Sequence, residues 1–220
     1  MADLRYGTTV GDDGVWAELL NRPLGAGVRP ALFLDRDGVI VEEVHYLHKV
    51  EDMRLVAGAA EVISRANRLG VPVVVVTNQA GIGRGIFHWP DFAAVQDAML
   101  DALSAAGAHV NAVFACPFHA NGVAPWNVAD HPDRKPGPGM LKRAAEMFRI
   151  DMGRSWIVGD RAGDVGAGRN AGLMGGMHVL SGHGNDEGER AAARAEAVGA
   201  FQVLEGASVA DALGRLPVLD

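Results

Sequence analysis

Cysteine is nearly absent from this chain of 220 residues, in which Cys116 is the single example. A chain with one cysteine cannot form an internal disulfide, which excludes a small secreted scaffold held together by disulfides. Long apolar runs are missing as well. Segments such as Val71–Val76 are far shorter than the roughly 20 residues that a membrane helix needs. We therefore expect no membrane partner.

Charge of one sign is not concentrated in any block of the sequence. The chain has 27 acidic and 20 basic residues, with a formal net charge of −7, so we expect no nucleic-acid partner. Residues 1–14 contain no basic stretch followed by an apolar stretch. This predicts the absence of a secretory signal and a cytoplasmic location.

The remaining composition is that of an ordinary globular protein, with 49% hydrophobic and 21% charged residues. Residues 1–29 are predicted to form an arm, in which residues 15–20 form a short helix that packs on the body. Residues 30–220 are predicted to form one domain. Strands are expected at 31–34, 73–76, 112–115, 156–158, 177–180 and 201–204, and helices at 58–69, 90–106, 140–147, 165–170, 187–197 and 209–213.

Strands that alternate with helices are typical of the α/β class. We therefore predict a three-layer, doubly wound and mostly parallel sheet with helices on both faces. The segment 117–138 between the third strand and the next helix is expected to be an irregular loop. Sheets of this kind bind ligands beyond the carboxyl ends of their strands, and the polar residues at those ends are the candidate functional residues.

Two aspartates follow the first strand of the predicted domain. Side chains alternate along an extended chain, so Asp35 and Asp37 are expected to face the same way and Arg36 to face away. Two adjacent carboxylates repel each other unless a cation or a shared proton intervenes. Carboxylate oxygens suit Mg²⁺, but Asp-Arg-Asp-Gly is also a common turn sequence. These residues alone favour neither interpretation.

Other polar residues follow the next strands. Thr77 and Asn78 precede a glycine-rich segment, Gln79–Gly85, whose backbone N–H groups could cradle phosphate oxygens. Asp160 follows the strand at 156–158, and Asp164 comes four residues later. Lys135 lies in a Pro/Gly-rich stretch before a helix, where it is well placed to neutralise a phosphate.

In this chain order the motifs resemble those of the haloacid dehalogenase-like superfamily of aspartyl-phosphate phosphatases. The resemblance covers roughly residues 30–215. It is strongest to the subgroup that contains heptose bisphosphate phosphatases and histidinol-phosphate phosphatase domains, which has little or no cap domain. The motifs that carry this resemblance are Phe33–Gly38, Thr77–Gly81, Cys116–Pro117 and Arg134–Met140.

The resemblance implies an Mg²⁺-dependent hydrolase of a small phosphorylated metabolite. A sugar bisphosphate such as heptose 1,7-bisphosphate is the expected substrate. Histidinol phosphate is the alternative, and a non-catalytic protein that binds phosphorylated ligands is a remote one. By the same resemblance Asp35 is the nucleophile and Asp37 the general acid and base. The implied Mg²⁺ ligands are Asp35, the backbone carbonyl of Asp37, and Asp160.

The resemblance also implies how the substrate is held. Thr77 and Asn78 are expected to bind phosphate oxygens, and Lys135 to stabilise the transferring group. Asp164 is expected to orient Lys135 or a metal-bound water. Arg134 is the candidate for a second contact, to the sugar or to a distal phosphate, because its planar guanidinium suits such a contact.

One feature of the subgroup is not retained, namely a structural zinc loop with ligands in the pattern Cys-x-His and Cys-x-Cys. The corresponding segments here are Cys116–Phe118 and His131–Asp133. A rearranged zinc site from Cys116, His119, His131 and Asp133 is conceivable. We expect instead that Phe118 and Trp126 pack the loop without zinc. A dinucleotide-binding fold is not indicated, because Gly166, Gly168 and Gly172 begin several residues past a strand end.

Overall fold

The computed structural model describes residues 9–22 and 27–220. These form an eight-stranded sheet in the order β1-β2-β5-β4-β3-β6-β7-β8. The pairs from β5 to β8 are parallel, whereas β1 with β2 and β2 with β5 are antiparallel. The strands are β1 (Thr9–Val10), β2 (Trp16–Leu19), β3 (Leu32–Leu34), β4 (Val73–Asn78), β5 (Ala112–Cys116), β6 (Trp156–Gly159), β7 (Gly175–Val179) and β8 (Gln202–Gly206).

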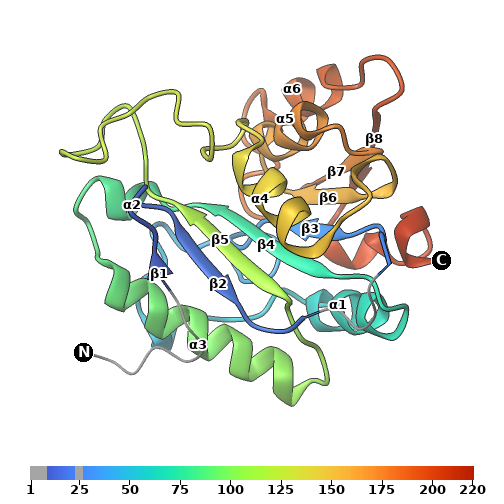
Figure 1. Ribbon diagram of the computed structural model, residues 1–220, viewed down its shortest axis with the longest axis horizontal. Helices are drawn as coiled ribbons and strands as arrows, with labels where there is room; N and C mark the ends of the chain where they lie inside the picture. The colour runs from blue at the N-terminus through green and yellow to red at the C-terminus, as the bar shows by residue number, and fades with distance from the viewer. Residues whose placement is uncertain (1–8, 23–26) are drawn as a thin grey trace.

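Helices cover both faces of the sheet (Figure 1). The α-helices are α1 (Ala59–Arg68), α2 (Ala80–Gly83), α3 (Trp89–Ala105), α4 (Gly139–Phe148), α5 (Ala162–Ala171) and α6 (Glu189–Ala195). Four short 3₁₀ helices are η1 (Val50–Asp52), η2 (Met152–Arg154), η3 (Val209–Ala212) and η4 (Pro217–Leu219). The predicted helix at 209–213 is thus a 3₁₀ helix, and the other predicted elements of residues 30–220 are present with small shifts at their ends.

The core is divided into two halves by the sheet. Leu32 and Leu34 pack with α1 and α3 on one face, whereas Phe33 packs with α4 and α5 on the other. All three side chains are buried. A strand that is apolar at every position therefore lies between two helical layers, as the continuous apolar sequence predicts. The predicted three-layer, mostly parallel sheet is confirmed.

The segment where a cap domain could be inserted is short. Residues 35–58, between β3 and α1, contain only the 3₁₀ helix η1 and single β-bridges. Residues 84–88, between α2 and α3, form a short connection. This agrees with the expectation of little or no cap domain, and it leaves the carboxyl edge of the sheet open.

The predicted helix at residues 15–20 is wrong. Strand β2 occupies Trp16–Leu19 and pairs antiparallel with β5 along Ala112–Ala115. The edge of β5 offers unpaired backbone groups, and this pairing satisfies them. Trp16 also stacks on Trp89, with ring centroids 5.3 Å apart. Trp89 thus packs on the N-terminal segment. The division of the chain at residue 29 stays a prediction.

Candidate active site

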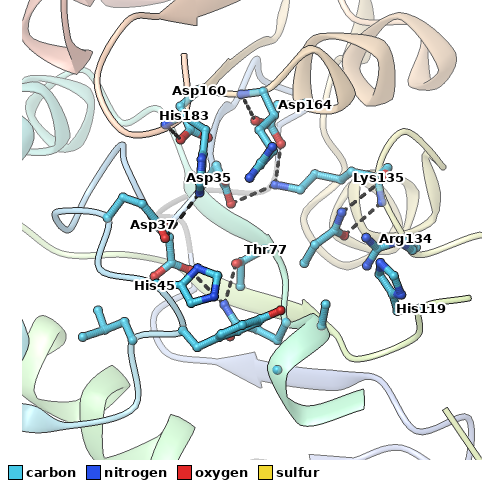
Figure 2. Close-up of a pocket in the computed structure, with 18 of the residues that line it drawn as sticks. Asp35, Asp37, His45, Thr77, His119, Arg134, Lys135, Asp160, Asp164 and His183 are labelled. Atoms are coloured by element: carbon cyan, nitrogen blue, oxygen red, sulfur yellow. Dashed lines mark hydrogen bonds and ion pairs between the residues drawn. The ribbon is translucent and has the colours of Figure 1, made fainter. Parts of the chain in front are cut away.

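The polar residues that the sequence singles out lie together at the carboxyl edge of the parallel strands. Asp35 follows β3, Thr77 is the last but one residue of β4, and Asp160 follows β6. Lys135 lies in the loop before α4. They line one cavity of about 420 Å³, shown in Figure 2. The cavity is also lined by Asp37, Glu43, His45, Tyr46, Asn78, Gln79, Arg84, His119, Arg134, Arg161, Asp164 and His183, among others.

Lys135 is a buried cation between two carboxylates of the cavity. Its Nζ lies 2.8 Å from Asp35 Oδ1 and 2.7 Å from Asp164 Oδ1, and it donates to the carbonyl oxygen of Val76 at 2.7 Å. The side chain is only 2% exposed. Burial alone lowers the pKa of Lys135, but the adjacent Asp164 and Asp35 raise it above its ordinary value. Lys135 is therefore a permanent positive charge.

Three carboxylates around this lysine form the candidate metal centre. One oxygen from each of Asp35, Asp160 and Asp164 lies within 4.8 Å of the other two. Burial raises the pKa of Asp35 to about 7, although Lys135 opposes the shift. Burial also raises the pKa of Asp160 to about 8, and the charge of Asp35 adds to the effect. Ionising both carboxyls in this buried site is therefore unfavourable, and a bound cation would favour their ionised forms.

The donor chemistry and the backbone around Asp160 fit Mg²⁺. Carboxylate oxygens are ligands that Mg²⁺ prefers. Two glycines, Gly38 and Gly182, have φ values of +78° and +55° and pass close to this carboxylate. A Cβ at either position would lie 2.4 or 2.3 Å from Asp160 Oδ2, so only glycine fits there. The backbone N–H of His183 donates to the same oxygen at 2.7 Å.

Asp164 is held at the start of helix α5. Its Oδ2 accepts the backbone N–H of Arg161 at 2.9 Å, which caps the helix, while its Oδ1 faces Lys135. A Cβ at Gly159 would lie 2.1 Å from the Cβ of Asp164, so the strand end needs glycine for this approach. The predicted contact between Asp164 and Lys135 is present, and its catalytic role stays a prediction.

Arg36 does not face away from Asp37, which corrects the expectation from simple alternation. Its Nε and Nη2 donate to the two oxygens of Asp37 at 3.2 and 3.0 Å. The chain turns immediately after β3, and Asp37 lies in a β-bridge with Val41, outside the strand. The two-residue period of an extended strand therefore no longer applies at residue 37.

Thr77 and Asn78 have different surroundings. Thr77 is 1% exposed, and its hydroxyl accepts from Gln79 Nε2 at 2.9 Å. The Asn78 side chain donates to the carbonyl of Lys135 at 3.1 Å and accepts its backbone N–H at 3.0 Å. It thus ties the Lys135 loop to β4. A direct contact from Asn78 to phosphate stays a prediction.

The glycine-rich segment after Thr77 forms the short helix α2 and not an open loop. Its glycines allow close packing, because a Cβ at Gly81 would lie 2.1 Å from the Phe87 ring and one at Gly83 would lie 2.1 Å from the carbonyl oxygen of Pro117. Three of its backbone N–H groups, at residues 82, 84 and 85, donate to carbonyls within the segment. These three N–H groups are therefore not available to a phosphate. Ala80 and Gly81 line the cavity, and a phosphate contact from their N–H groups stays a prediction.

Two arginines, Arg84 and Arg134, also line the cavity. Arg134 donates to the Phe118 carbonyl at 2.9 Å, and Arg84 contacts the Tyr46 hydroxyl at 2.5 Å and His119 Nε2 at 3.1 Å. Burial, Arg134 and Arg84 lower the pKa of His119. Within residues 9–22 and 27–220, neither arginine forms an ion pair with a carboxylate. This wall can therefore receive an anion.

Sequence reasoning missed several residues of the cavity wall. Gln79 and Arg84 lie in the glycine-rich segment Gln79–Gly85, close to Thr77 in the sequence. This closeness could have indicated that their side chains line the same cavity. Glu43 and His183 come from distant segments, and their side chains meet at 3.4 Å. Nothing in the local sequence of either one indicates this meeting.

The four candidate zinc ligands have other partners. Phe118, at an expected ligand position, stacks on His131 with ring centroids 3.9 Å apart and meets Trp126 edge-on at 5.3 Å. Arg143 donates two hydrogen bonds to Asp133, at 2.9 and 2.7 Å. His119 contacts Arg84. Burial raises the pKa of the Cys116 thiol to about 12, which opposes thiolate formation. The expectation about zinc stays a prediction.

Comparison with known proteins identifies relatives over most of the chain. A family model described as HAD-hydrolase-like matches residues 133–206. The D-glycero-beta-D-manno-heptose-1,7-bisphosphate 7-phosphatase of Mesorhizobium japonicum is 45% identical over 168 residues, which cover 76% of this chain and 77% of the relative. The corresponding alpha-anomer 7-phosphatase of Photorhabdus laumondii is 37% identical, covering 70% and 85%.

A solved structure has the same fold. The D,D-heptose 1,7-bisphosphate phosphatase of B. bronchiseptica, complexed with magnesium and phosphate, matches with a TM-score of 0.67 and 28% sequence identity. The match covers 82% of this chain and 94% of that one. In the part of the chain that the structure describes, no helix is both long and apolar enough to cross a membrane.

Proposed function

Because this chain belongs to the haloacid dehalogenase-like phosphatases, we propose that it removes one phosphate from a sugar bisphosphate through a phosphorylated Asp35. The chain is an enzyme that hydrolyses phosphomonoesters. The single observation that carries the proposal is the arrangement of Asp35, Asp160 and Asp164 around Lys135 in a cavity that two arginines also line. The predicted cytoplasmic location stays a prediction.

In the first step, an oxygen of Asp35 attacks phosphorus and the bond from phosphorus to the sugar oxygen breaks. The departing sugar oxygen takes a proton from Asp37 and leaves as an alcohol. This splits a difficult displacement into two easier steps. Lys135 stays beside the transferring group and stabilises its negative charge, and the hydroxyl of Thr77 donates to a phosphate oxygen.

In the second step, water attacks the phosphorus of the phosphorylated Asp35. Asp37 takes a proton from this water, the bond between phosphorus and Asp35 breaks, and inorganic phosphate leaves. Asp37 thus returns to its protonated form, ready for the next substrate. Asp164 holds Lys135 in place during both steps, which is consistent with its 2.7 Å contact.

Asp35, Asp160 and the backbone carbonyl of Asp37 are the proposed Mg²⁺ ligands. When bound, Mg²⁺ would offset the repulsion among the carboxylates and the phosphate and polarise the phosphoryl group. Burial and the neighbouring carboxylates raise the pKa values of Asp35 and Asp160, and a cation bound among these carboxylates would offset that effect.

Arg134, together with Arg84, is proposed to bind the second phosphate of the substrate. Both side chains line the cavity, and their neighbours His119, Tyr46 and the Phe118 carbonyl do not neutralise them. Arginine matches phosphate oxygens with paired hydrogen bonds. A heptose 1,7-bisphosphate carries the second phosphate that these arginines would bind. The names of the proteins similar to this chain support it as the substrate. The alpha and beta names of those relatives leave both anomers as candidates.

The test is a phosphate-release screen with and without Mg²⁺. Both anomers of D-glycero-D-manno-heptose 1,7-bisphosphate, hexose monophosphates, histidinol phosphate and nucleotides would be compared by kcat/KM. We expect a heptose bisphosphate to be the best substrate. A preference for histidinol phosphate, or equal rates with mono- and bisphosphates, would contradict the proposal.

The variant Arg134→Met tests the second-phosphate contact directly. We expect it to lose about 10- to 100-fold in kcat/KM with the bisphosphate, as for a lost charged hydrogen bond of about 1.5–3 kcal/mol, and to lose little with a monophosphate. Arg161→Met is the matched control, because Arg161 also lines the cavity but pairs with Glu189 at 3.2 Å. Equal losses with both substrates would remove Arg134 from this role.

A further inference from the structure

We propose that Arg36, together with Gln79, is a positioning residue that holds the Asp37 carboxylate in place for proton transfer. The inference rests on the proposed function, in which Asp37 gives and takes the proton. It adds a role for two residues that neither bind the metal nor form the nucleophile. Arg36 is not among the residues that line the cavity in the described part of the chain, so it acts on the reaction through Asp37.

Arg36 is held rigidly on the side of Asp37 that faces the core. The residue is 0% exposed, although it carries a full charge. Its guanidinium lies over the Phe92 ring, 4.8 Å from the ring centroid. Nε and Nη2 donate to both oxygens of Asp37. Burial of a charge is costly unless the charge is paired, so this side chain has one strong partner and little freedom to move.

Gln79 completes the contact from the phosphate side. Its Nε2 donates to Asp37 Oδ2 and to the Thr77 hydroxyl, at 2.9 Å in both cases. The side chain is 4% exposed. One amide therefore links the proposed acid and base to a proposed phosphate ligand. Asp37 receives hydrogen bonds from two directions while remaining accessible to the cavity, with a side-chain exposure of 19%.

This arrangement matters because proton transfer depends on position. A misplacement of about 1 Å at a reacting group can cost roughly 100-fold in rate. A free Asp37 would rotate about its side-chain torsions and move out of reach of the sugar oxygen in the first step and of the attacking water in the second. The paired hydrogen bonds from Arg36 fix the carboxylate plane as well as its distance, which a lysine at the same position could not do.

The experiment separates proton transfer from the rest of the reaction by changing the leaving group. The two substrates are p-nitrophenyl phosphate and heptose 1,7-bisphosphate. The first releases p-nitrophenolate, a stable anion that needs no proton from Asp37, whereas the C7 oxygen of the second does need one. Rapid-mixing measurements give the first-turnover rate with each substrate. For Arg36→Met we expect the first-turnover rate with the heptose substrate to fall about 100-fold and that with the p-nitrophenyl substrate to fall no more than about threefold. The substrate concentration that gives half of the maximal first-turnover rate should change little.

The second half-reaction provides another readout. Attack of water on the phosphorylated Asp35 needs Asp37 as a base with either substrate. Arg36→Met should therefore release p-nitrophenolate in a rapid first turnover, followed by a slow steady state, with phosphorylated enzyme accumulating. Arg36→Lys keeps the charge without the paired geometry and should show a smaller loss with the heptose substrate.

Two further variants serve as controls. Gln79→Met should give the same leaving-group pattern in milder form, and it tests the inference if Arg36→Met does not fold. Arg190→Met removes another arginine that donates two hydrogen bonds to one carboxylate, that of Glu205 on the surface. It should leave the first-turnover rates with both substrates unchanged.

The outcomes distinguish this inference from the proposed function. Equal losses with both leaving groups in a folded Arg36→Met would indicate a general structural role and overturn the inference. No loss with either substrate would overturn it as well. If the wild-type enzyme forms no phosphorylated Asp35 in Mg²⁺, the proposed function fails, whatever the arginine variants do.

Discussion

Replacement of Lys135 by Met tests the electrostatics of the site most directly. Methionine has a similar length and lacks the charge, so the change leaves packing nearly intact and removes one cation from among three carboxylates. The Lys135 amine contacts Asp35 and Asp164 while 2% exposed. Removing one member of a buried ion pair costs about 3–5 kcal/mol, because a buried charge remains without a partner.

This loss corresponds to a clear change in thermal stability. In a chain of about this size 1 kcal/mol shifts Tm by roughly 2–4 °C, so Lys135→Met should melt about 6–20 °C below the wild type at pH 8 without Mg²⁺. Lys142→Met is the matched control, because Lys142 is exposed on the same helix, α4, that follows the Lys135 loop. It should melt within about 2 °C of the wild type.

The effect should depend on pH with a definite sign. Burial raises the pKa of Asp35 to about 7 and of Asp160 to about 8, above the ordinary value of 3.8. Between the ordinary value of 3.8 and these raised values, the folded protein keeps protons that the unfolded chain has released. The free energy of unfolding therefore falls as the pH rises through this range. Without Lys135 the pKa values of these carboxyls rise further. The Tm difference between variant and wild type should be larger at pH 8 than at pH 5.

Differential scanning fluorimetry at both pH values measures these differences, and circular dichroism checks that the variant is folded. Added Mg²⁺ should restore part of the lost stability, because it supplies positive charge among the same carboxylates. If Lys135→Met melts like the wild type at pH 8 in chelator, these carboxylates do not carry buried negative charge, and the reasoning about the metal site is refuted.

Three further predictions concern chemistry and metals. Asp35→Asn should fold and lose turnover, because an amide is too poor a nucleophile; activity above a few per cent of wild type by phosphate release would remove Asp35 from its role. Chelation should abolish activity, Mg²⁺ should restore it, and Ca²⁺ should inhibit because its longer bonds displace the nucleophile; full activity in excess chelator would contradict a metal site. Purified protein should contain well under one zinc per chain, and stoichiometric zinc by elemental analysis, lost in His131→Ala, would overturn that expectation.

The parallel strands were predictable because their amino-acid composition alone indicates that they are buried on both faces. Val73–Val76 is a run of β-branched residues, which disfavours a helix and suits a strand covered on both faces. Strand β2 gives no such signal. Its residues alternate between buried and partly buried positions, and only the free edge of β5 determines that they form a strand. A pairing between residues almost 100 positions apart is not encoded in a local window.

The clustering of the candidate site residues was predictable for a related reason. The carboxyl ends of parallel strands meet at one edge, so Asp35, Thr77 and Asp160 had to lie near one another once the strands were assigned. Contacts that depend on a turn or on side-chain reach were not predictable. Arg36 lies between two aspartates in sequence, and alternation directs it away from them. The turn after Asp35 reverses that expectation and brings its guanidinium onto Asp37.

In the loop after β5, side-chain contacts connect the segments whose counterparts in the subgroup carry the zinc ligands. Positions 118 and 131 correspond to ligand positions in the subgroup with zinc, and here their side chains are two flat rings that stack at 3.9 Å. Position 133 also corresponds to a ligand, and its carboxylate is paired with Arg143, which in turn pairs with Asp13 from the N-terminal segment. Stacking and ion pairing thus connect the same parts of the loop that a metal would connect. The loop is also anchored to the N-terminal segment and carries Arg134, which lines the cavity. These contacts are the physical reason for the prediction that the loop folds without zinc.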